Sequence, residues 1–543
     1  MKKKNNPELS SVETDTTCRW SSEAIRTQLK RILGHAEFQA TDKMHEFLRF
    51  VVEETLAGRS QHVKGFTIAV EVYGRDADFD AAHDPVVRIQ AGRLRRAMER
   101  YYLVSGGQDP IRIEIPKGSY VPVFSEGPGC ESFPDRVGAL PKVQRSTTSW
   151  PTIMITPFDD RTGKPELAYL GVGLATELCV ELGHCEDLRV MLYRAGPLDA
   201  QELNARPDFI VSGNVRFDGS AIKIVVQMSD GATGEQYWVD SLHSPLESES
   251  LIAFQEKSAN TIAAHIAAEH GVITRTNTLQ LGSRLADLTC YEAILKGYAY
   301  HHTMTPASYM QALDALHQLR AREPECGLGC TLLALLYMDN VALEFLDLEL
   351  TPLDETLKLA REGALMLPTS QFSRLVLARG RMLENQLDLA LSEVEAALAL
   401  HPESLLFMDA IGYLLLLLGE WDRGEQLVRE AIEQNPFYAV YARYGLWLNA
   451  IRQQDYARAL EQTEITIEIG DFWGPLSRAA TLGLLGRPAE GRDSVQQLLL
   501  MKPNFQQRGR LLIGHYVKFP EIVDQLVEGL ASAGLTIDGT LQE

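Results

Sequence analysis

A spacing of 34 residues recurs in the C-terminal half of the chain and constrains its fold more than any other feature. Pro368, Pro402 and Pro436 stand 34 residues apart. A small residue stands twelve positions before each end of a repeat, at Ala312, Thr356, Ala390, Gly424, Ala459 and Gly491. Small side chains are needed where two helices cross closely. Residues 285 to 543 are therefore predicted to form about six stacked helix pairs with a helical cap over residues 506 to 533.

Further positions fit a known repeat pattern, namely Leu377-Ala378, Ala397, Ile411-Gly412 and Ala431. The pattern resembles that of tetratricopeptide (TPR) repeats. The resemblance implies an all-α superhelix with a concave groove for a protein or peptide partner. The first repeat is stretched, and its insertion from Asp339 to Pro352 is predicted to be a loop.

A second feature is the arginine-rich stretch from Asp84 to Phe124. Asp84 and Pro85 suit the start of a helix, which is predicted to run to about Leu103. Helical spacing gathers apolar residues on one arc and leaves a cationic face. That face carries Arg88, Arg93, Arg95, Arg96 and Arg100. A strand from Ile111 to Ile115, a turn at residues 116 to 119 and a return strand from Tyr120 to Phe124 are predicted to follow. A basic helix beside a two-stranded hairpin is an arrangement that can bind DNA.

The motifs in this stretch are Val87-Arg88-Ile89, Gly92-Arg93-Leu94-Arg95-Arg96, Ile111-Arg112-Ile113 and Pro116-Lys117-Gly118-Ser119-Tyr120. They resemble the end of an OmpR/PhoB-type winged-helix DNA-binding domain. Residues 44 to 56 and 64 to 75 resemble the first and second helices of that family, so the match covers about residues 42 to 124. The resemblance implies double-stranded DNA as the partner. The DNA-binding residues are then Arg88, Arg93, Arg95, Arg96, Arg100, Arg112 and Lys117.

Acidic residues next to this face leave an alternative open. Asp76, Asp78, Asp80 and Glu99 could form ion pairs with the arginines, in which case the helix would not meet DNA. Asp76, Asp78, Asp80 and Asp84 could also suggest a calcium loop, but the Gly and the closing Glu of such a loop are missing. We expect these carboxylates to solvate a turn and to cap the helix.

Residues 150 to 273 alternate between strand and helix patterns. Strands are predicted at 152 to 158, 188 to 192, 209 to 217, 222 to 228 and 236 to 242, and helices at 170 to 182 and 248 to 269. Asp218-Gly219 indicates a hairpin. The segments Ile155 to Phe158, Tyr169 to Leu174, Val211 to Val215 and Asp230 to Trp238 resemble a TolB-like amino-terminal domain, which implies a binding or signalling module. Gly171-Val172-Gly173 could cradle an anion or could form a tight strand-to-helix turn.

The net charge of the first 130 residues differs from that of the rest of the chain. Residues 1 to 130 carry 19 Lys and Arg against 18 Asp and Glu, whereas the remainder carries 33 against 55. An acidic body would be discouraged from lying on phosphate backbone, but soluble proteins are often acidic, which is the alternative explanation of this charge. The seven cysteines are scattered and odd in number, which indicates reduced thiols. We expect a disordered tail over residues 1 to 20, a linker over 127 to 149, and a cytoplasmic protein without a membrane segment.

Motifs for catalysis are missing from the sequence. It holds no P-loop, HExxH, G-x-S-x-G or kinase motif set, and Cys326 and Cys330 have no partner at metal-ligand spacing. We expect no enzyme activity, cofactor or metal. The predicted fold is multidomain, with a winged helix (α+β) at 21–126, an α/β TolB-like domain at 150–273 and an all-α TPR superhelix at 285–543. The predicted function is transcriptional regulation or signalling. The alternative is a scaffold without DNA binding, for example in a nucleotide-cyclase-linked pathway.

Overall fold

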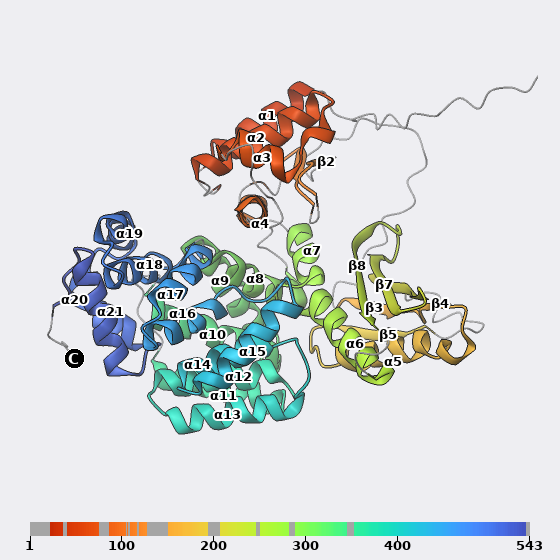
Figure 1. Ribbon diagram of the computed structural model, residues 1–543. Helices are drawn as coiled ribbons and strands as arrows, with labels where there is room; N and C mark the ends of the chain where they lie inside the picture. The colour runs from red at the N-terminus through yellow and green to blue at the C-terminus, as the bar shows by residue number, and fades with distance from the viewer. Residues whose placement is uncertain are drawn as a thin grey trace, which may run out of the picture. The chain divides into compact units, whose positions relative to one another are not determined.

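The chain forms two compact units, Met1–Leu140 and Pro141–Glu543, called here the N-terminal unit and the body (Figure 1). The protein is seen in a computed structural model. It describes residues 22–35, 38, 41–74, 86–104, 106, 109–116, 119–126, 150–193, 207–245, 250–281, 288–344, 352–467 and 469–538. The predicted tail, the predicted linker, the acidic loop at 76 to 84 and Lys117 lie outside these residues.

The N-terminal unit combines helices with a small sheet. Thr41 begins the second helix, because its side chain accepts a hydrogen bond from the amide of Met44 at 3.4 Å. Buried side chains from each long helix, such as Ile25, Phe47 and Leu94, form the core together with Ile113 of the sheet. The elements are α1 (Ser22–Leu33), α2 (Asp42–Leu56), η1 (Ser60–His62), α3 (Gly65–Glu71), α4 (Val86–Val104), β1 (Ile111–Glu114) and β2 (Val123–Glu126).

The hairpin of the N-terminal unit differs from the prediction in its second strand. The return strand was expected at residues 120 to 124, but β2 spans Val123–Glu126 and pairs antiparallel with β1, Ile113 facing Phe124. Ser119 and Tyr120, which precede β2, contact the helices instead. The ring of Tyr120 lies 6.3 Å from that of Phe47, and the carbonyl of Ser119 is bound by Arg95. The chain therefore returns to the sheet a few residues later than its alternating pattern indicates.

The first part of the body is an α/β layer. Its sheet has the order β5-β3-β6-β7-β8, parallel between β5, β3 and β6 and antiparallel from β6 to β8, and β4 also pairs with β6. Alternate residues of β7, such as Ile224 and Val226, are buried with the apolar face of α5. The elements are β3 (Thr152–Ile155), β4 (Asp159–Arg161), η3 (Pro165–Leu167), α5 (Leu170–Leu182), β5 (Arg189–Leu192), β6 (Phe209–Phe217), β7 (Ala221–Asp230), β8 (Gln236–Pro245) and α6 (Leu251–Ala267).

Two predicted turns of this layer have a clear physical basis. Gly219 has φ of +99°, and the side chain of Asp218 accepts the amides of Ser220 and Ala221, so the predicted hairpin is present. A Cβ on Gly171 would lie 2.0 Å from the carbonyl oxygen of Phe158. The glycine at the start of α5 is therefore required by close backbone contact between strand and helix.

The rest of the body is helical. The helices are α7 (Val272–Leu281), α8 (Cys290–Thr303), α9 (Pro306–Arg322), α10 (Gly327–Leu343), α11 (Leu353–Met366), α12 (Gln371–Leu383), α13 (Leu387–Leu400), α14 (Met408–Leu417), α15 (Trp421–Gln434), α16 (Ala442–Arg452), α17 (Tyr456–Thr466), α18 (Trp473–Leu484), α19 (Pro488–Met501), α20 (Phe505–Gly514) and α21 (Pro520–Ser532). From α8 to α19 they pack as consecutive pairs, and α21 packs on α18.

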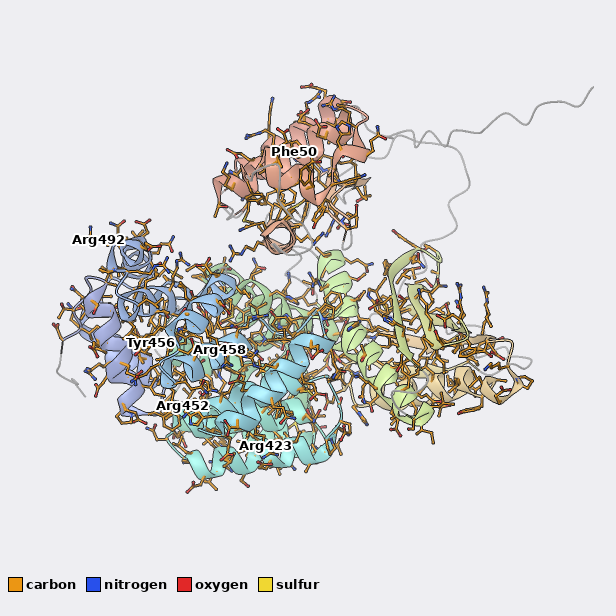
Figure 2. The ribbon with its side chains drawn as sticks, viewed as in Figure 1. Phe50, Arg423, Arg452, Tyr456, Arg458 and Arg492 are labelled. Atoms are coloured by element: carbon orange, nitrogen blue, oxygen red, sulfur yellow. The ribbon has the colours of Figure 1, made fainter. Side chains whose placement is uncertain are left out.

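The two helices of a pair cross closely at the small residues that stand twelve positions before the end of each predicted repeat. Ala312, Ala390 and Ala459 have no exposed surface. A Cβ on Gly424 would lie 2.7 Å from the carbonyl oxygen of Gly412, which leaves no room for a side chain. Arg423 pairs with Glu395 and Arg458 pairs with Glu425; both arginines are labelled in Figure 2. Ion pairs therefore join the second helices of neighbouring pairs.

One predicted loop is wrong in its first part. The insertion from Asp339 to Pro352 was expected to be a loop, yet α10 continues to Leu343 and Asp339 is buried within it. The physical reason is that Asp339 forms ion pairs with His301 and Arg379 inside the body, and these are satisfied only if the helix extends this far.

The α/β layer and the helical array share buried contacts. The ring of Phe437, from the helical array, belongs to the core under the sheet. His265 of α6 contacts the carbonyl oxygen of Gln434 at 2.9 Å, and the ring of His184 stacks on that of His401 at 3.5 Å. The two predicted domains therefore form one compact unit. None of the described helices is both long and apolar enough to cross a bilayer.

Candidate functional site

In the N-terminal unit, Arg95 fixes the hairpin against α4. Its Nε donates to the carbonyl of Ile115 at 2.8 Å, and its Nη2 donates to the carbonyls of Pro116 and Ser119, both at 2.9 Å. Burial lowers the pKa of this guanidinium, but an arginine still remains charged at neutral pH. Three charge-assisted bonds from one side chain hold the turn of the hairpin at a set distance from the helix.

Two tyrosines at the end of α4 fix the first strand. The hydroxyl of Tyr102 accepts the amide of Ile113 at 2.7 Å, and the guanidinium of Arg112 lies 4.9 Å from the centre of the Tyr102 ring. The hydroxyl of Tyr101 donates to buried Asp109 at 2.6 Å, and Arg31 of α1 pairs with the same carboxylate at 2.8 Å. Helix and hairpin therefore form one rigid surface.

The predicted DNA-binding residues have different surroundings in this surface. Arg88, Arg93, Arg95, Arg96 and Arg100 all belong to α4, but the side chains of Arg88, Arg96 and Arg100 lie outside the described set. Arg93 is half-buried near Tyr73, whose pKa is raised by burial. Arg95 and Arg112 both contact the hairpin region, Arg95 through the carbonyls of Ile115, Pro116 and Ser119, and Arg112 beside the ring of Tyr102. Arg112 pairs there with Glu114, whose side chain is half exposed.

The body contains a buried network of charges that the sequence does not reveal. Nδ1 of His301 in α8 lies 2.5 Å from Oε1 of Glu269, which follows α6. Nε2 of His301 lies 3.7 Å from Oδ2 of Asp339 in α10. Arg379 of α12 then bonds both Asp339 and the hydroxyl of Tyr516, which follows α20. The network joins the α/β layer, three successive helix pairs and the C-terminal helices.

Electrostatics keep this network ionised. Burial by itself would lower the pKa of His301, but the carboxylates of Glu269 and Asp339 raise it to about 9. Arg379 and His301 hold the pKa of Asp339 below its usual range against the effect of burial. The two cations and two anions balance each other, which is the condition for burying charges in a protein core. The neighbouring pair His270 and His302 stays neutral, because burial lowers the pKa of each ring to about 3.

The sequence could not have shown this network. Its members are separated by 32 to 137 positions along the chain, and His301, Asp339 and Arg379 occupy three different repeats. The one available signal was a charged residue on the apolar side of a helix, as at Asp339 in the run Leu332 to Leu343.

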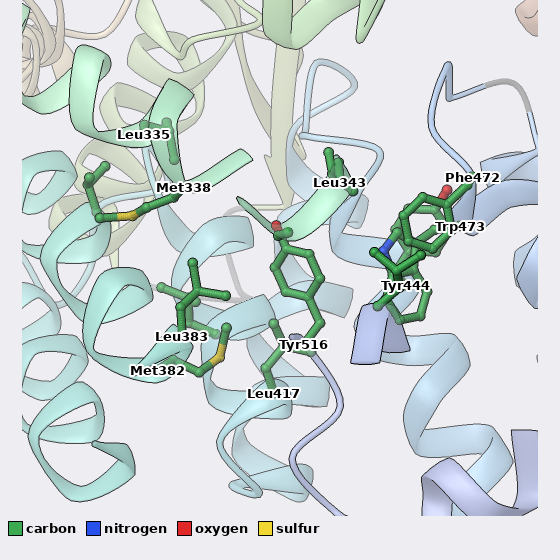
Figure 3. Packing of buried hydrophobic residues seen from close by; sticks show 14 of the residues in the cluster. Leu335, Met338, Leu343, Met382, Leu383, Leu417, Tyr444, Phe472, Trp473 and Tyr516 are labelled. Atoms are coloured by element: carbon green, nitrogen blue, oxygen red, sulfur yellow. The ribbon is translucent and has the colours of Figure 1, made fainter. Parts of the chain in front are cut away.

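A small aromatic cavity lies next to the network. Tyr444, Trp473 and Tyr516 line it with Leu417 (Figure 3). Its volume is about 10 Å³, which is room for about one water molecule. Within the described ranges, no three His, Cys, Asp or Glu side chains gather to hold a metal ion.

Comparison with known proteins gives one distant likeness. No protein-family profile matches the chain. A stretch of 202 residues is 25% identical to "Putative adenylate cyclase 3" of Rhizobium meliloti (strain 1021). The match covers 35% of this chain and 33% of the relative, so the chain spans about a third of the protein it matches.

Proposed function

We propose that this protein is a signalling protein without enzyme activity, whose N-terminal unit binds double-stranded DNA as a winged helix. The body, in this proposal, combines a TolB-like layer with TPR-like repeats and receives a protein partner. The observation that carries the proposal is the junction of α4 and the hairpin, where Arg95 bonds three hairpin carbonyls. A long arginine-bearing helix held beside a rigid hairpin suits insertion of the helix into the major groove.

In this proposal the arginines have different roles: base contact, phosphate contact, or positioning of the hairpin. Arg88 stands near the N-terminus of α4, where residues of this motif class reach base edges, and is proposed to read bases. Arg93, Arg96, Arg100, Arg112 and Lys117 are proposed to contact phosphates. Arg95 is proposed to be a positioning residue, since its Nε and Nη2 donate to carbonyls within the protein. Glu114 partly neutralises Arg112 and would release it to a phosphate at low cost, because exposed ion pairs are weak.

The signal to the body is proposed to be a protein rather than a small molecule. The aromatic cavity is too small for an organic ligand. His301, Asp339 and Arg379 of α8, α10 and α12 are already covered by Glu269 and Tyr516 of the same chain. A partner would therefore bind the remaining exposed surface of the helical array, as helical repeats do.

Genome-wide recovery of crosslinked DNA tests the proposal. The full-length protein should enrich discrete genomic sites, and the Arg88→Ala variant should lose or redistribute them. A Lys358→Ala variant, altered in α11 of the body, is the matched control and should keep the same sites. Enrichment equal to that of an untagged strain would refute DNA binding.

A scaffold in nucleotide-cyclase signalling is the second candidate. The 25% identity to a protein named as an adenylate cyclase favours it. The sequence has no recognisable cyclase residues, so the purified chain should form no cyclic AMP from ATP and Mg²⁺. If the chain binds no DNA but co-purifies from cells with a nucleotide cyclase, the scaffold function replaces the DNA-binding one. Cyclic AMP formation by the purified chain would contradict both.

A further inference from the structure

Two cysteines from different helix pairs meet at the start of the helical array. Cys290 is the first residue of α8, and Cys326 is the N-terminal capping residue of α10. Their Sγ atoms lie 3.4 Å apart, although the residues are 36 positions apart in the chain. Both are free thiols and only half-buried, so small oxidants in solution can reach them.

The surroundings of Cys326 favour its thiolate. The hydrogen bond that it shares with Cys290, together with the amides of Gly329 and Leu328, lowers the pKa of Cys326 to about 7, against the effects of burial and of the Glu323 carboxylate. The start of α10 also offers the positive end of the helix dipole to a negative sulfur. The same hydrogen bond to Cys326, together with burial, raises the pKa of Cys290.

We propose that Cys290 and Cys326 form a redox-active pair that peroxide oxidises to a disulfide. The thiolate of Cys326 attacks one oxygen of hydrogen peroxide, forming a sulfenic acid and releasing hydroxide. Cys290 then attacks the sulfenic sulfur, a sulfur–sulfur bond forms, and the sulfur–oxygen bond breaks. The departing hydroxide takes the thiol proton. Two thiols and one peroxide give one disulfide and two waters, and each sulfur loses one electron.

The contact between the two sulfur atoms is the geometric basis of this bond. They must approach from 3.4 Å to a bond length of about 2.0 Å. The resulting bond would tie the start of α8, the helix that carries His301, to the start of α10, the helix that carries Asp339.

A third cysteine provides an internal control. Cys330 follows Cys326 by one helical turn, and its Sγ accepts a hydrogen bond from Arg320 at 2.5 Å. Burial leaves the pKa of the Cys330 thiol raised, because it outweighs the guanidinium of Arg320, which acts to lower that pKa. The proposal assigns the bond to Cys290, not to Cys330, because Sγ of Cys290 already contacts Sγ of Cys326.

The test uses the reduced full-length protein exposed to hydrogen peroxide, followed by alkylation and peptide mass spectrometry. Peptides containing Cys290 and Cys326 should appear joined, about 2 Da lighter than their sum, and should separate with dithiothreitol. The Cys330→Ala and Cys179→Ser variants should keep this crosslink. In Cys290→Ser, Cys326 should react with dimedone as a sulfenic acid. In Cys326→Ser, Cys290 should stay reduced at the same dose.

Three results would overturn the proposal. The first is full alkylation of Cys290 and Cys326 after a peroxide dose that oxidises other thiols of the chain. The second is a bond between Cys326 and Cys330 that is lost in Cys330→Ala while no bond to Cys290 forms. The third is absence of sulfenic acid at Cys326 in Cys290→Ser, provided that circular dichroism shows the variant to be folded.

Discussion

Single charged residues, through their ion pairs, determine which segments are helical and buried in the interior of the body. Asp339 was predicted to lie in a loop because the first repeat is longer than the others and needs an insertion. It is instead held inside α10 by His301 and Arg379, which come from the neighbouring helix pairs. Local sequence cannot show such pairing, since the partners meet only when the pairs have stacked. The helix α4 was predictable for the opposite reason, because its start and its apolar spacing depend on residues within one segment.

The charge on His301 makes the stability of the body depend on pH. The pKa of an unfolded histidine is 6.5, whereas His301 in the folded body has a pKa of about 9. The stabilisation is fully present below pH 6.5 and is lost as the pH rises to 9. A loss on the order of 2–3 kcal/mol is expected over this window. Urea unfolding followed by circular dichroism should show it, and His301→Gln should show a flatter dependence. An equal dependence in both proteins would contradict the assignment.

Arg95 is expected to matter for the stability of the N-terminal unit. Arg95→Ala removes three bonds to hairpin carbonyls and should lower the free energy of unfolding by about 2 kcal/mol. Arg59→Ala is the matched control, because Arg59 forms an exposed pair with Glu54 and should have no measurable effect. Thermal unfolding of residues 1 to 140 measures both. Equal melting temperatures for the two variants would mean that Arg95 does not hold the hairpin.

At the scale of elements, the repeat period predicts where helices pair but not how the pairs are joined. The small residues mark close crossings because steric exclusion acts locally, between two helices adjacent in the chain. The start of the second hairpin strand was harder to predict. Tyr120 packs against Phe47, and Ser119 is bound by Arg95, so neither residue pairs with β1. Both partners lie far away in the sequence. Long-range contacts of this kind override an alternating pattern.

Gly424 tests the close crossing of α14 and α15. A Cβ there would lie 2.7 Å from the carbonyl oxygen of Gly412 and 2.8 Å from the amide nitrogen of Leu416. Gly424→Ala should therefore destabilise the body by about 1–3 kcal/mol. Gly514→Ala, at the end of α20, meets no atom within 4 Å and should be neutral or slightly stabilising. Chemical denaturation separates the two, and a stabilised Gly424→Ala variant would be incompatible with the crossing.

For the whole molecule, the structure divides the chain into the N-terminal unit and the body. The sequence did not predict that the α/β layer and the helical array share a core. The reason is that Phe437, His265 and His401 look like ordinary repeat or helix residues until their contacts are known. A change of pattern along the chain therefore does not by itself mark a boundary between independently folding parts.

This shared core predicts the behaviour of fragments. Residues 285 to 543 alone should be helical but should melt at a lower temperature than residues 150 to 543, because removal of the α/β layer exposes apolar side chains and leaves His301 without Glu269. Circular dichroism melts of the two fragments give the comparison. Identical melting temperatures would show that the layer contributes nothing to the helical array.

DNA binding by the N-terminal unit is the central claim, and the salt dependence of binding tests it most directly. Fluorescence anisotropy of labelled duplex DNA with the full-length protein should show log affinity falling linearly with log salt, with a slope of about −0.9 per phosphate contact. Arg96→Ala should flatten that slope by about one unit, whereas Arg423→Ala, at an exposed pair on the body, should leave it unchanged. The absence of duplex binding even at low salt would contradict the account.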